Sequence, residues 1–204
     1  MIAIIDNNLG NLGSMSNMLR KIGAPAVVTS DAAEIERASK LILPGVGAFD
    51  TGMRNLSQRG LLEVLRYKAL VEQVPILGVC LGMQLMAKHS EEGREAGLGW
   101  VDADVVRFQN AGDPQFKIPN MGWNSVRPAK EHHLIGDLGE ESRFYFVHSY
   151  FLRCANADDV LLTAEYGCEF VAGFQHRNVM GVQFHPEKSH KYGMRLLANF
   201  AGRC

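Results

Sequence analysis

The sequence has no long hydrophobic run and no excess of charge of either sign. Basic and acidic side chains number 21 and 22, and no block of five or more like charges suggests a nucleic-acid-binding arm. No apolar stretch approaches the ~20 residues of a membrane-spanning helix, and the four apolar residues after Met1 are too few for a signal peptide. These absences argue against nucleic acid and membrane partners and favour a cytoplasmic protein.

Cysteine is scarce and scattered. No C-x-x-C pair occurs among Cys80, Cys154, Cys168 and Cys204, which argues against a zinc site and against a disulfide framework. We therefore expect no metal and a reducing compartment. Hydrophobic residues make up 47% of the 204 residues, enough for one core. We expect a single domain over residues 1–204.

Hydrophobic patterning predicts that strands and helices alternate in the first ninety or so residues. Short apolar runs indicate buried strands, and apolar residues at helical spacing indicate helices between them. The predicted strands are 2–5, 26–29, 41–45 and 76–80, and the predicted helices are 15–22, 31–38, 61–70 and 81–89. This alternation is typical of a parallel sheet with helices on both faces.

From about residue 98 the pattern changes to strands, at 100–108, 144–152, 160–167 and 169–184. The last of them breaks at Arg177 and Asn178, as a β-hairpin does. A terminal helix follows, with an apolar face made of Met194, Leu197, Ala198 and Ala201. We predict an α/β fold with a three-layer, open, mixed and mainly parallel sheet, helices on both faces, and extra antiparallel strands in the second half.

Cys80 lies where a predicted strand gives way to a predicted helix. Gly78-Val79-Cys80-Leu81-Gly82 matches the G-x-nucleophile-x-G pattern of a strand-to-helix elbow. In such an elbow the nucleophile occupies a strained turn, and the glycines let backbones cross closely. The N-terminus of the following helix favours a thiolate. These five residues alone are equally compatible with a small core cysteine.

A candidate base lies in the stretch GVQFHPEKS, residues 181–189. A thiol nucleophile needs a base within hydrogen-bond reach and a third group that orients the base. His185 and Glu187 are two residues apart at a predicted strand end, so both side chains point the same way in an extended backbone. The alternative is a structural histidine followed by a glutamate at a helix N-terminus. Together with Cys80 they form a candidate catalytic triad.

The loop LPGVG, residues 43–47, ends another predicted strand. Its Pro-Gly-x-Gly sequence leaves backbone N–H groups free at the same edge of the sheet. There they can stabilise a tetrahedral oxyanion alongside the N–H of Leu81. Taken alone, the loop is only a turn signal.

Six ordered motifs give the chain a resemblance to a known family. They are GNL at 10–12, LPGVGAF at 43–49, GVCLGMQ at 78–84, MGWN at 121–124, FYFVHSY at 144–150 and HPEKS at 185–189. With them the chain resembles class I (triad) glutamine amidotransferase domains, and most closely the glutaminase subunits of imidazole glycerol phosphate synthases in histidine biosynthesis. The resemblance implies that Cys80, His185 and Glu187 hydrolyse glutamine to glutamate and ammonia without a cofactor.

The resemblance also implies roles for residues around the triad. Val46 and Leu81 resemble the oxyanion donors, and the matching contacts to the L-glutamine substrate are Gly47, Gln84, Ser149 and Tyr150. Without the family pattern, Gln84 reads as a helix-surface amide, and Ser149 and Tyr150 read as ordinary strand residues.

Ammonia near neutral pH is mostly ammonium, which is not a nucleophile, so a glutaminase must pass it on directly. The family's partner is a (βα)₈-barrel synthase subunit that carries the ammonia tunnel and forms a heterodimer. The matching interface residues here are Asn11, Met121, Trp123 and Lys188. The alternative for Trp123 is a core tryptophan on a loop that folds inward.

Two positions depart from the family pattern. Asn7 stands where tyrosine is common, and Asn120 stands where histidine is common. We expect both on the partner-facing side, which leaves the acceptor of the ammonia open. The alternative acceptor is a sugar intermediate of bacterial surface polysaccharides, which receives an amidino group. Alternatives of other classes are a stand-alone cysteine hydrolase of γ-glutamyl or peptide substrates and a non-catalytic binding module.

Overall fold

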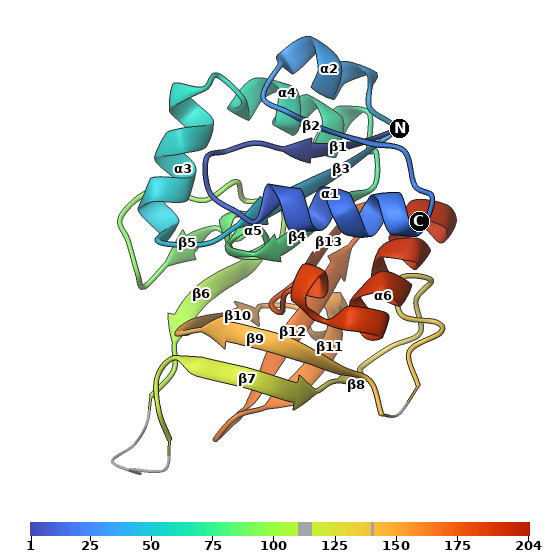
Figure 1. The fold of residues 1–204 in the computed structure, drawn as a ribbon. Helices are drawn as coiled ribbons and strands as arrows, with labels where there is room; N and C mark the ends of the chain where they lie inside the picture. Colours follow the sequence, from blue (N-terminus) through green and yellow to red (C-terminus); the bar gives the residue numbers. More distant parts are fainter. Residues whose placement is uncertain (110–115, 140) are drawn as a thin grey trace.

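The computed structural model describes residues 1–109, 116–139 and 141–204. Figure 1 shows a long sheet with helices packed on both of its faces. The elements of the first half are β1 (Ile2–Ile5), α1 (Leu12–Lys21), β2 (Ala26–Thr29), α2 (Ala32–Arg37), β3 (Lys40–Gly45), α3 (Phe49–Gln58), α4 (Leu62–Arg66), a π-helical turn (Tyr67–Val71), β4 (Ile76–Cys80) and α5 (Leu81–Leu85).

The second half is rich in strands. Its elements are β5 (His89–Ser90), β6 (Ala103–Arg107), β7 (Asn120–Ser125), β8 (Arg127–Pro128), β9 (Arg143–His148), β10 (Tyr150–Cys154), a 3₁₀ turn (Ala157–Asp159), β11 (Val160–Glu165), β12 (Glu169–His176), β13 (Val179–Val182), a second 3₁₀ turn (Pro186–Lys188) and α6 (His190–Arg203).

The main sheet runs in the order β2-β1-β3-β4-β13-β12-β10-β6-β5. All neighbours from β2 to β13 pair in parallel, which confirms the predicted parallel half. Gly45 lies opposite Cys80, and Val79 lies opposite Val182. The carboxyl ends of β3, β4 and β13 therefore meet at one edge, and this edge carries the candidate site.

The rest of the sheet is mostly antiparallel. β12 and β13 form the predicted hairpin, with Arg177 in the left-handed region at φ 53°. β12 also pairs with β10 and β11, and β10 pairs with β6, all antiparallel. The predicted mixed sheet with added antiparallel strands is confirmed.

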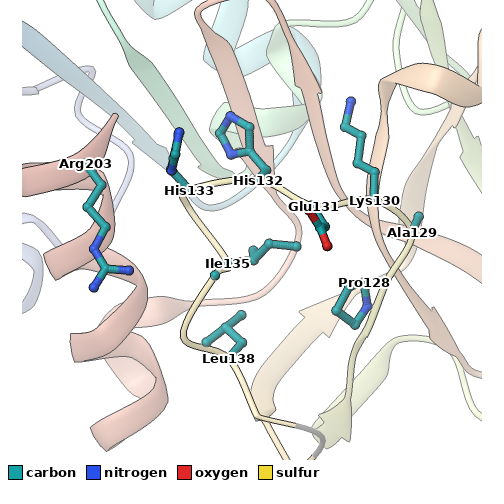
Figure 2. Close-up of a pocket in the computed structure, with 10 residues that line it drawn as sticks. Pro128, Ala129, Lys130, Glu131, His132, His133, Ile135, Leu138 and Arg203 are labelled. Atoms are coloured by element: carbon teal, nitrogen blue, oxygen red, sulfur yellow. The ribbon is translucent and has the colours of Figure 1, made fainter.

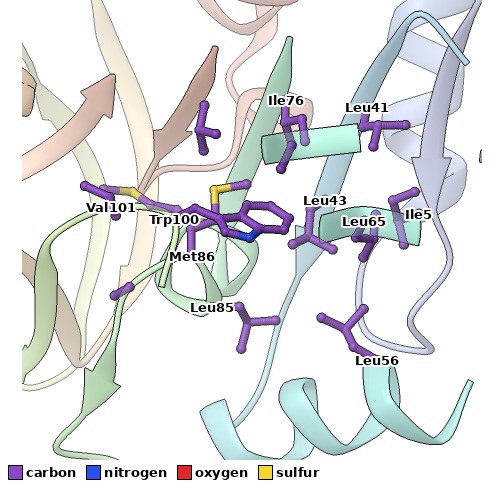
Figure 3. Packing of buried hydrophobic residues seen from close by; sticks show 14 of the residues in the cluster. Ile5, Leu41, Leu43, Leu56, Leu65, Ile76, Leu85, Met86, Trp100 and Val101 are labelled. Carbon is purple, nitrogen blue, oxygen red and sulfur yellow. The ribbon is translucent and has the colours of Figure 1, made fainter. Parts of the chain in front are cut away.

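Two buried cores lie on the two faces of the sheet. Along β3, Leu41 and Leu43 face one core while Ile42 faces the other, as the alternation of side chains along a strand requires. The first core includes residues of α2, α3 and α4, and Figure 3 shows the indole of Trp100 packed within it. The second core includes residues of α1 and α6. These are the predicted three layers.

The predicted strand at 144–152 is wrong as a single element. It is divided at Ser149 into β9, which pairs with β7 in a separate two-stranded sheet, and β10, which belongs to the main sheet. Phe144 stacks on Phe184 with ring centroids 3.9 Å apart. β9 therefore covers the region just after β13 instead of extending β10.

Several helices differ from the sequence predictions, and the helix predicted over 61–70 changes to a π-helical turn at Tyr67. The pattern missed α3 altogether, and the helix predicted over 81–89 ends at Leu85. It ends there because the carbonyls of Leu85 and Met86 accept hydrogen bonds from Leu98 and Trp100. In α6 the buried apolar residues include Leu196, Leu197 and Phe200, whereas Ala198 of the predicted face is exposed.

Among the described residues, no helix is both long enough and apolar enough to cross a membrane.

Candidate active site

Cys80 ends β4 in a backbone conformation that is rare for a residue with a side chain, with φ 54° and ψ −110°. A Cβ on Gly82 would overlap the carbonyl oxygen of Leu43, and one on Gly78 would lie 2.7 Å from the backbone of Met83. No real Cβ approaches backbone atoms so closely. The predicted strained elbow, with glycines at a close backbone crossing, is confirmed.

His185 and Glu187 lie just beyond β13, the strand next to β4. His185 Nδ1 and Glu187 Oε1 are 2.8 Å apart, and these side chains are only 1% and 4% exposed. Glu187 lies in the 3₁₀ turn rather than in an extended segment, so the predicted strand geometry between the two residues is wrong. The turn is held by Ser189, whose hydroxyl donates to the His185 carbonyl at 2.6 Å and accepts from the Tyr145 N–H at 3.0 Å.

Opposing effects act on the pKa of His185. Burial by itself lowers this pKa, but the neighbouring Cys80 sulfur and the Glu187 carboxylate favour the charged ring and raise the pKa from 6.5 to about 10. His185 Nε2 is buried and has no hydrogen-bond partner. A protonated His185 therefore has one free N–H beside Cys80.

The other cysteines have environments that disfavour a thiolate. Burial is the main cause in each case. It raises the pKa of Cys154 to about 12, and it also raises the pKa values of Cys168 and Cys204. None of these three residues follows a strand-to-helix elbow. Cys80 lies at such an elbow and next to the pair formed by His185 and Glu187.

The loop after β3 lies beside the elbow. A Cβ on Gly45 would lie 3.0 Å from the Leu81 side chain and 3.1 Å from the Gly82 nitrogen. Val46 and Leu81, the predicted oxyanion donors, thus follow two adjacent strand ends. Val46 is 40% exposed, and Gly47 has φ +105°, which favours glycine.

Asn7 lies beneath this loop and is fully buried. Its Nδ2 donates to the Pro44 carbonyl at 3.2 Å, and its Oδ1 accepts from the Leu9 N–H. Asn120 is also buried, with Nδ2 3.1 Å from His148 Nε2. That Asn7 and Asn120 lie on the partner-facing side stays a prediction, but both side chains are enclosed by the chain itself and are not exposed for direct contact.

Behind Cys80 lies a buried network of amides. Gln84 Nε2 donates to the Tyr150 carbonyl and to Gln183 Oε1, both at 3.0 Å. Gln183 Nε2 lies 3.6 Å from Cys80 Sγ. Gln84 and Tyr150 are thus brought to the triad, and Gln84 is not a helix-surface amide. Ser149, between β9 and β10, accepts from the Phe108 N–H through its carbonyl.

Sequence reasoning missed the role of Gln183. The signal was present, because in Gln183-x-His185 two polar side chains alternate with apolar ones directly after a buried strand. His148 lies in the same buried region. Its ring is held between Asn120 and the Tyr150 carbonyl, and burial, with a smaller effect of nearby His185, lowers its pKa to about 4.

The predicted partner-facing residues are exposed. Met121 and Trp123 are 62% and 45% exposed, so the alternative of a core tryptophan is wrong. Trp123 stacks on the ring of His190, and Lys188 Nζ lies 5.7 Å from the ring centroid of Tyr145. Trp123 and Lys188 share the neighbour Tyr145. Asn11, also exposed, caps the N-terminus of α1.

A cavity of about 860 Å³ lies elsewhere, between the segment 128–138 and the end of α6 (Figure 2). Its lining includes His132, His133, Lys130 and Arg203 but no residue of the candidate triad. In the part of the chain that the structure describes, no cluster of three or more His, Cys, Asp or Glu side chains is arranged to hold a metal ion.

A family model described as glutamine amidotransferase class-I matches residues 3–204. The chain belongs to this family. As a class I glutamine amidotransferase it is an enzyme with glutaminase chemistry, and the family implies the Cys-His-Glu triad that Cys80, His185 and Glu187 match. The resemblance seen in the sequence is confirmed.

This amidotransferase has similar relatives of nearly the same length. It is 50% identical over 200 residues to imidazole glycerol phosphate synthase subunit HisH 2 of Pseudomonas aeruginosa, with 98% of each chain covered. It is 52% identical over 200 residues to the protein of the same name from Methanococcus maripaludis, again with 98% of each chain covered.

Among solved structures, its fold is similar to that of a protein described as a glutamine amidotransferase. The TM-score is 0.72 at 21% identity, covering 98% of this chain and 96% of the other. The fold is also similar to PurLQS from Thermotoga maritima, with a TM-score of 0.70 at 16% identity, covering 98% and 96%.

Proposed function

We propose that this chain is the glutaminase subunit of an imidazole glycerol phosphate synthase in histidine biosynthesis. It acts as a single cytoplasmic domain over residues 1–204, hydrolyses L-glutamine, and passes ammonia to a (βα)₈-barrel synthase subunit in a heterodimer. The observation that carries the proposal is the identity of 50% and 52% over 98% of the chain to subunits of that name. The arrangement of Cys80, His185 and Glu187 supports it independently.

In the first half of the reaction Cys80 Sγ attacks the side-chain amide carbon of glutamine. The carbonyl oxygen becomes an oxyanion, which the N–H groups of Val46 and Leu81 stabilise. His185 gives the proton on Nε2 to the amide nitrogen, the C–N bond breaks, and ammonia leaves a thioester on Cys80. The raised pKa of His185 supports this role, because the ring begins the reaction protonated.

In the second half water attacks the thioester. His185, now neutral, takes a proton from the water through Nε2, and the C–S bond breaks to release glutamate and restore the thiolate. Glu187 accepts the hydrogen bond from Nδ1–H at 2.8 Å, which keeps Nε2 directed at the reacting atoms in both halves. Glu187 is thus the orienting group of the triad.

The substrate contacts are proposed on the same side. Gly47 and the region of Gln84, Ser149 and Tyr150 border the elbow and hold the amino-acid part of glutamine. Because β3 and β4 end side by side, the glycine loop and the elbow reach the substrate together.

The partner surface is proposed around Met121 and Trp123, with Lys188 and Asn11. Met121 and Trp123 are both exposed and lie two residues apart on β7, and large exposed aromatic side chains are typical interface anchors. Lys188 directly follows Glu187, so contact with the partner at Lys188 lies next to the triad. The alternative acceptor, a sugar intermediate, would use the same surface with a different barrel.

The test is glutamate release by the purified chain with and without the cognate histidine-pathway barrel and its acceptor. We expect the barrel to stimulate release at least tenfold, and we expect Cys80→Ala to abolish release while Cys168→Ala, at an exposed cysteine, retains it. Stimulation by a sugar-modifying barrel alone would move the proposal to the amidino-sugar pathway. Full activity without a partner, on larger γ-glutamyl substrates, would support a stand-alone hydrolase instead.

A further inference from the structure

Gln183 places an amide beside the sulfur of Cys80. Its side chain is fully buried, and its Nε2 lies 3.6 Å from Cys80 Sγ. The residue directly follows β13, and its backbone N–H is used by the Ala172 carbonyl. Two residues later comes His185, so one short segment delivers both a ring and an amide to the same sulfur.

The direction of the amide is set by a chain of hydrogen bonds that starts at a backbone carbonyl. The Tyr150 oxygen can only accept, so the group of Gln84 that faces it at 3.0 Å is the NH₂ group. The same Nε2 donates its second hydrogen to Gln183 Oε1. The NH₂ group of Gln183 is therefore the end that faces Cys80, and the chain terminates in a donor aimed at sulfur.

The Tyr150 carbonyl is fixed from a second side. His148 Nδ1 lies 2.8 Å from the same oxygen and donates to it, with the other ring nitrogen against Asn120. The carbonyl oxygen thus accepts two hydrogen bonds. A reversed Gln84 amide would place its own oxygen against this carbonyl oxygen and lose the hydrogen bond. Each step of the network is a buried group with a defined donor or acceptor, which makes reversal of any one amide costly.

We propose that Gln183 donates a hydrogen bond to the Cys80 thiolate and so stabilises the nucleophile of the glutaminase reaction. The catalytic importance of this hydrogen bond rests on the proposed function, whereas the experiment that tests the hydrogen bond does not. A buried anion needs donors, and helix α5 after Cys80 has only five residues, which limits its dipole. A hydrogen bond from Gln183 supplies part of the thiolate stabilisation that the short helix does not.

The amide also differs from His185 in a way that suits the reaction. His185 loses its proton when ammonia leaves, and it then no longer donates toward the sulfur. An amide does not titrate, so Gln183 keeps its donor at Cys80 through both halves of the reaction. When the thiolate forms again at the end, one hydrogen-bond partner is already in place.

The titratable groups that face the sulfur are few. His185 is the direct neighbour, with Glu187 behind it, and both belong to the triad. His148 lies further back and stays neutral above about pH 4. A change at Gln183 therefore alters the sulfur's hydrogen bonding without adding or removing a titratable group, provided the new side chain is uncharged.

The test is the pH dependence of Cys80 alkylation by iodoacetamide in the full chain, followed by mass spectrometry of the Cys80 peptide. Gln183→Leu removes the donor, and we expect the midpoint of the alkylation profile to move up by about one pH unit. Gln183→Met is uncharged and close in length to glutamine but has no N–H donor, and we expect the same upward shift from it. Asn199→Leu is the matched control, because it removes a buried amide that bonds to the Leu134 carbonyl far from Cys80.

A purely structural role for Gln183 predicts a different result. Gln183→Leu and Gln183→Met would then lower the unfolding temperature yet alkylate Cys80 with the parent's midpoint, and that outcome overturns the proposal. If Gln183→Leu does not fold, Gln183→Met, which is closer to glutamine in length, decides by the same measurement. Alkylation needs neither glutamine nor a partner, so a failure of the proposed function would leave this test readable.

Discussion

The side of the site that carries the proposed nucleophile is enclosed, whereas the side that carries the proposed oxyanion donors is open. On the nucleophile side the side chains of Cys80, Gln183, His185 and Glu187 are buried and hydrogen-bonded to one another or lie in direct contact. On the oxyanion side, residues 44–47, Val46 is 40% exposed, and the side-chain hydrogen bond to this loop comes from Asn7 to the Pro44 carbonyl.

This difference indicates that the two sides of the site are positioned in different ways. The proposed nucleophile, base and orienting acid are set by the fold of this chain, because they are held by neighbours in the main sheet and by the backbone of Tyr145 in β9. The oxyanion loop has fewer restraints and borders the solvent. A barrel partner that docks near Trp123 can act on the open side without rebuilding the enclosed side.

The largest effect is expected where the enclosed side loses its base. His185→Ala should lower kcat for glutamine hydrolysis by about 10³-fold or more, because no other group can move the proton at Nε2. The matched control is His176→Ala, since His176 forms a similar 2.8 Å pair with Asp159 away from the site. Initial rates of glutamate release decide. Equal losses in the two variants would mean that the His185 pair has only a structural role.

The next effect concerns the backbone crossing that shapes the elbow. Gly82→Ala places a methyl group against the Leu43 carbonyl and should reduce the free energy of unfolding by more than about 3 kcal/mol. Gly13→Ala, in helix α1 with nothing within 4 Å of the added Cβ, should instead stabilise by about 0.5–1 kcal/mol. Urea denaturation measures both. A tolerated Gly82→Ala would show that the crossing can relax.

A third effect is the pH dependence of folding stability that comes from His148. The pKa of His148 falls from 6.5 to about 4 on folding, so below pH 6.5 the unfolded chain binds a proton that the folded chain does not. Stability therefore decreases as the pH falls from 6.5 toward 4, by about 3 kcal/mol in total from this residue. His148→Gln, which keeps a donor and an acceptor, should remove this part of the slope in urea denaturation at several pH values. An unchanged slope would contradict a buried neutral ring.

The smallest effect is expected on the open side. Asn7→Ala removes the donor to the Pro44 carbonyl, and kcat should fall about five- to tenfold, in line with one lost hydrogen bond. Asn178→Ala is the control, because Asn178 also donates to backbone carbonyls, those of Ala69 and Val74, but far from the loop. Steady-state kinetics with the barrel partner compares them. A thousandfold loss of kcat in Asn7→Ala would contradict this comparison, because it would show that the open side depends on its contacts as strongly as the enclosed side does.

Local patterns in the sequence predicted much of this molecule. The strands at 2–5, 26–29 and 76–80 were found at their observed bounds, because short buried strands bounded by turns have a clear apolar signature. The elbow was also predictable, since Gly78 and Gly82 flank Cys80 at a strand end, and a close crossing requires glycine there.

Features set by contacts between distant segments escaped prediction. The early end of α5 depends on Leu98 and Trp100, which donate to its last carbonyls. The burial of Asn7 depends on the loop at Pro44, and the amide of Gln183 is oriented through Gln84 from Tyr150. None of these partners is near in sequence, so periodicity could not reveal them.

The central claim is that Cys80 attacks glutamine from the enclosed side. The most direct measurement is labelling of the complex by 6-diazo-5-oxo-L-norleucine, a glutamine-like electrophile, with mass-spectrometric mapping of the adduct. We predict one adduct, on the peptide containing Cys80, that accumulates in step with the loss of glutaminase activity. Activity lost through an adduct at Cys154, Cys168 or Cys204, with Cys80 unmodified, would contradict the account.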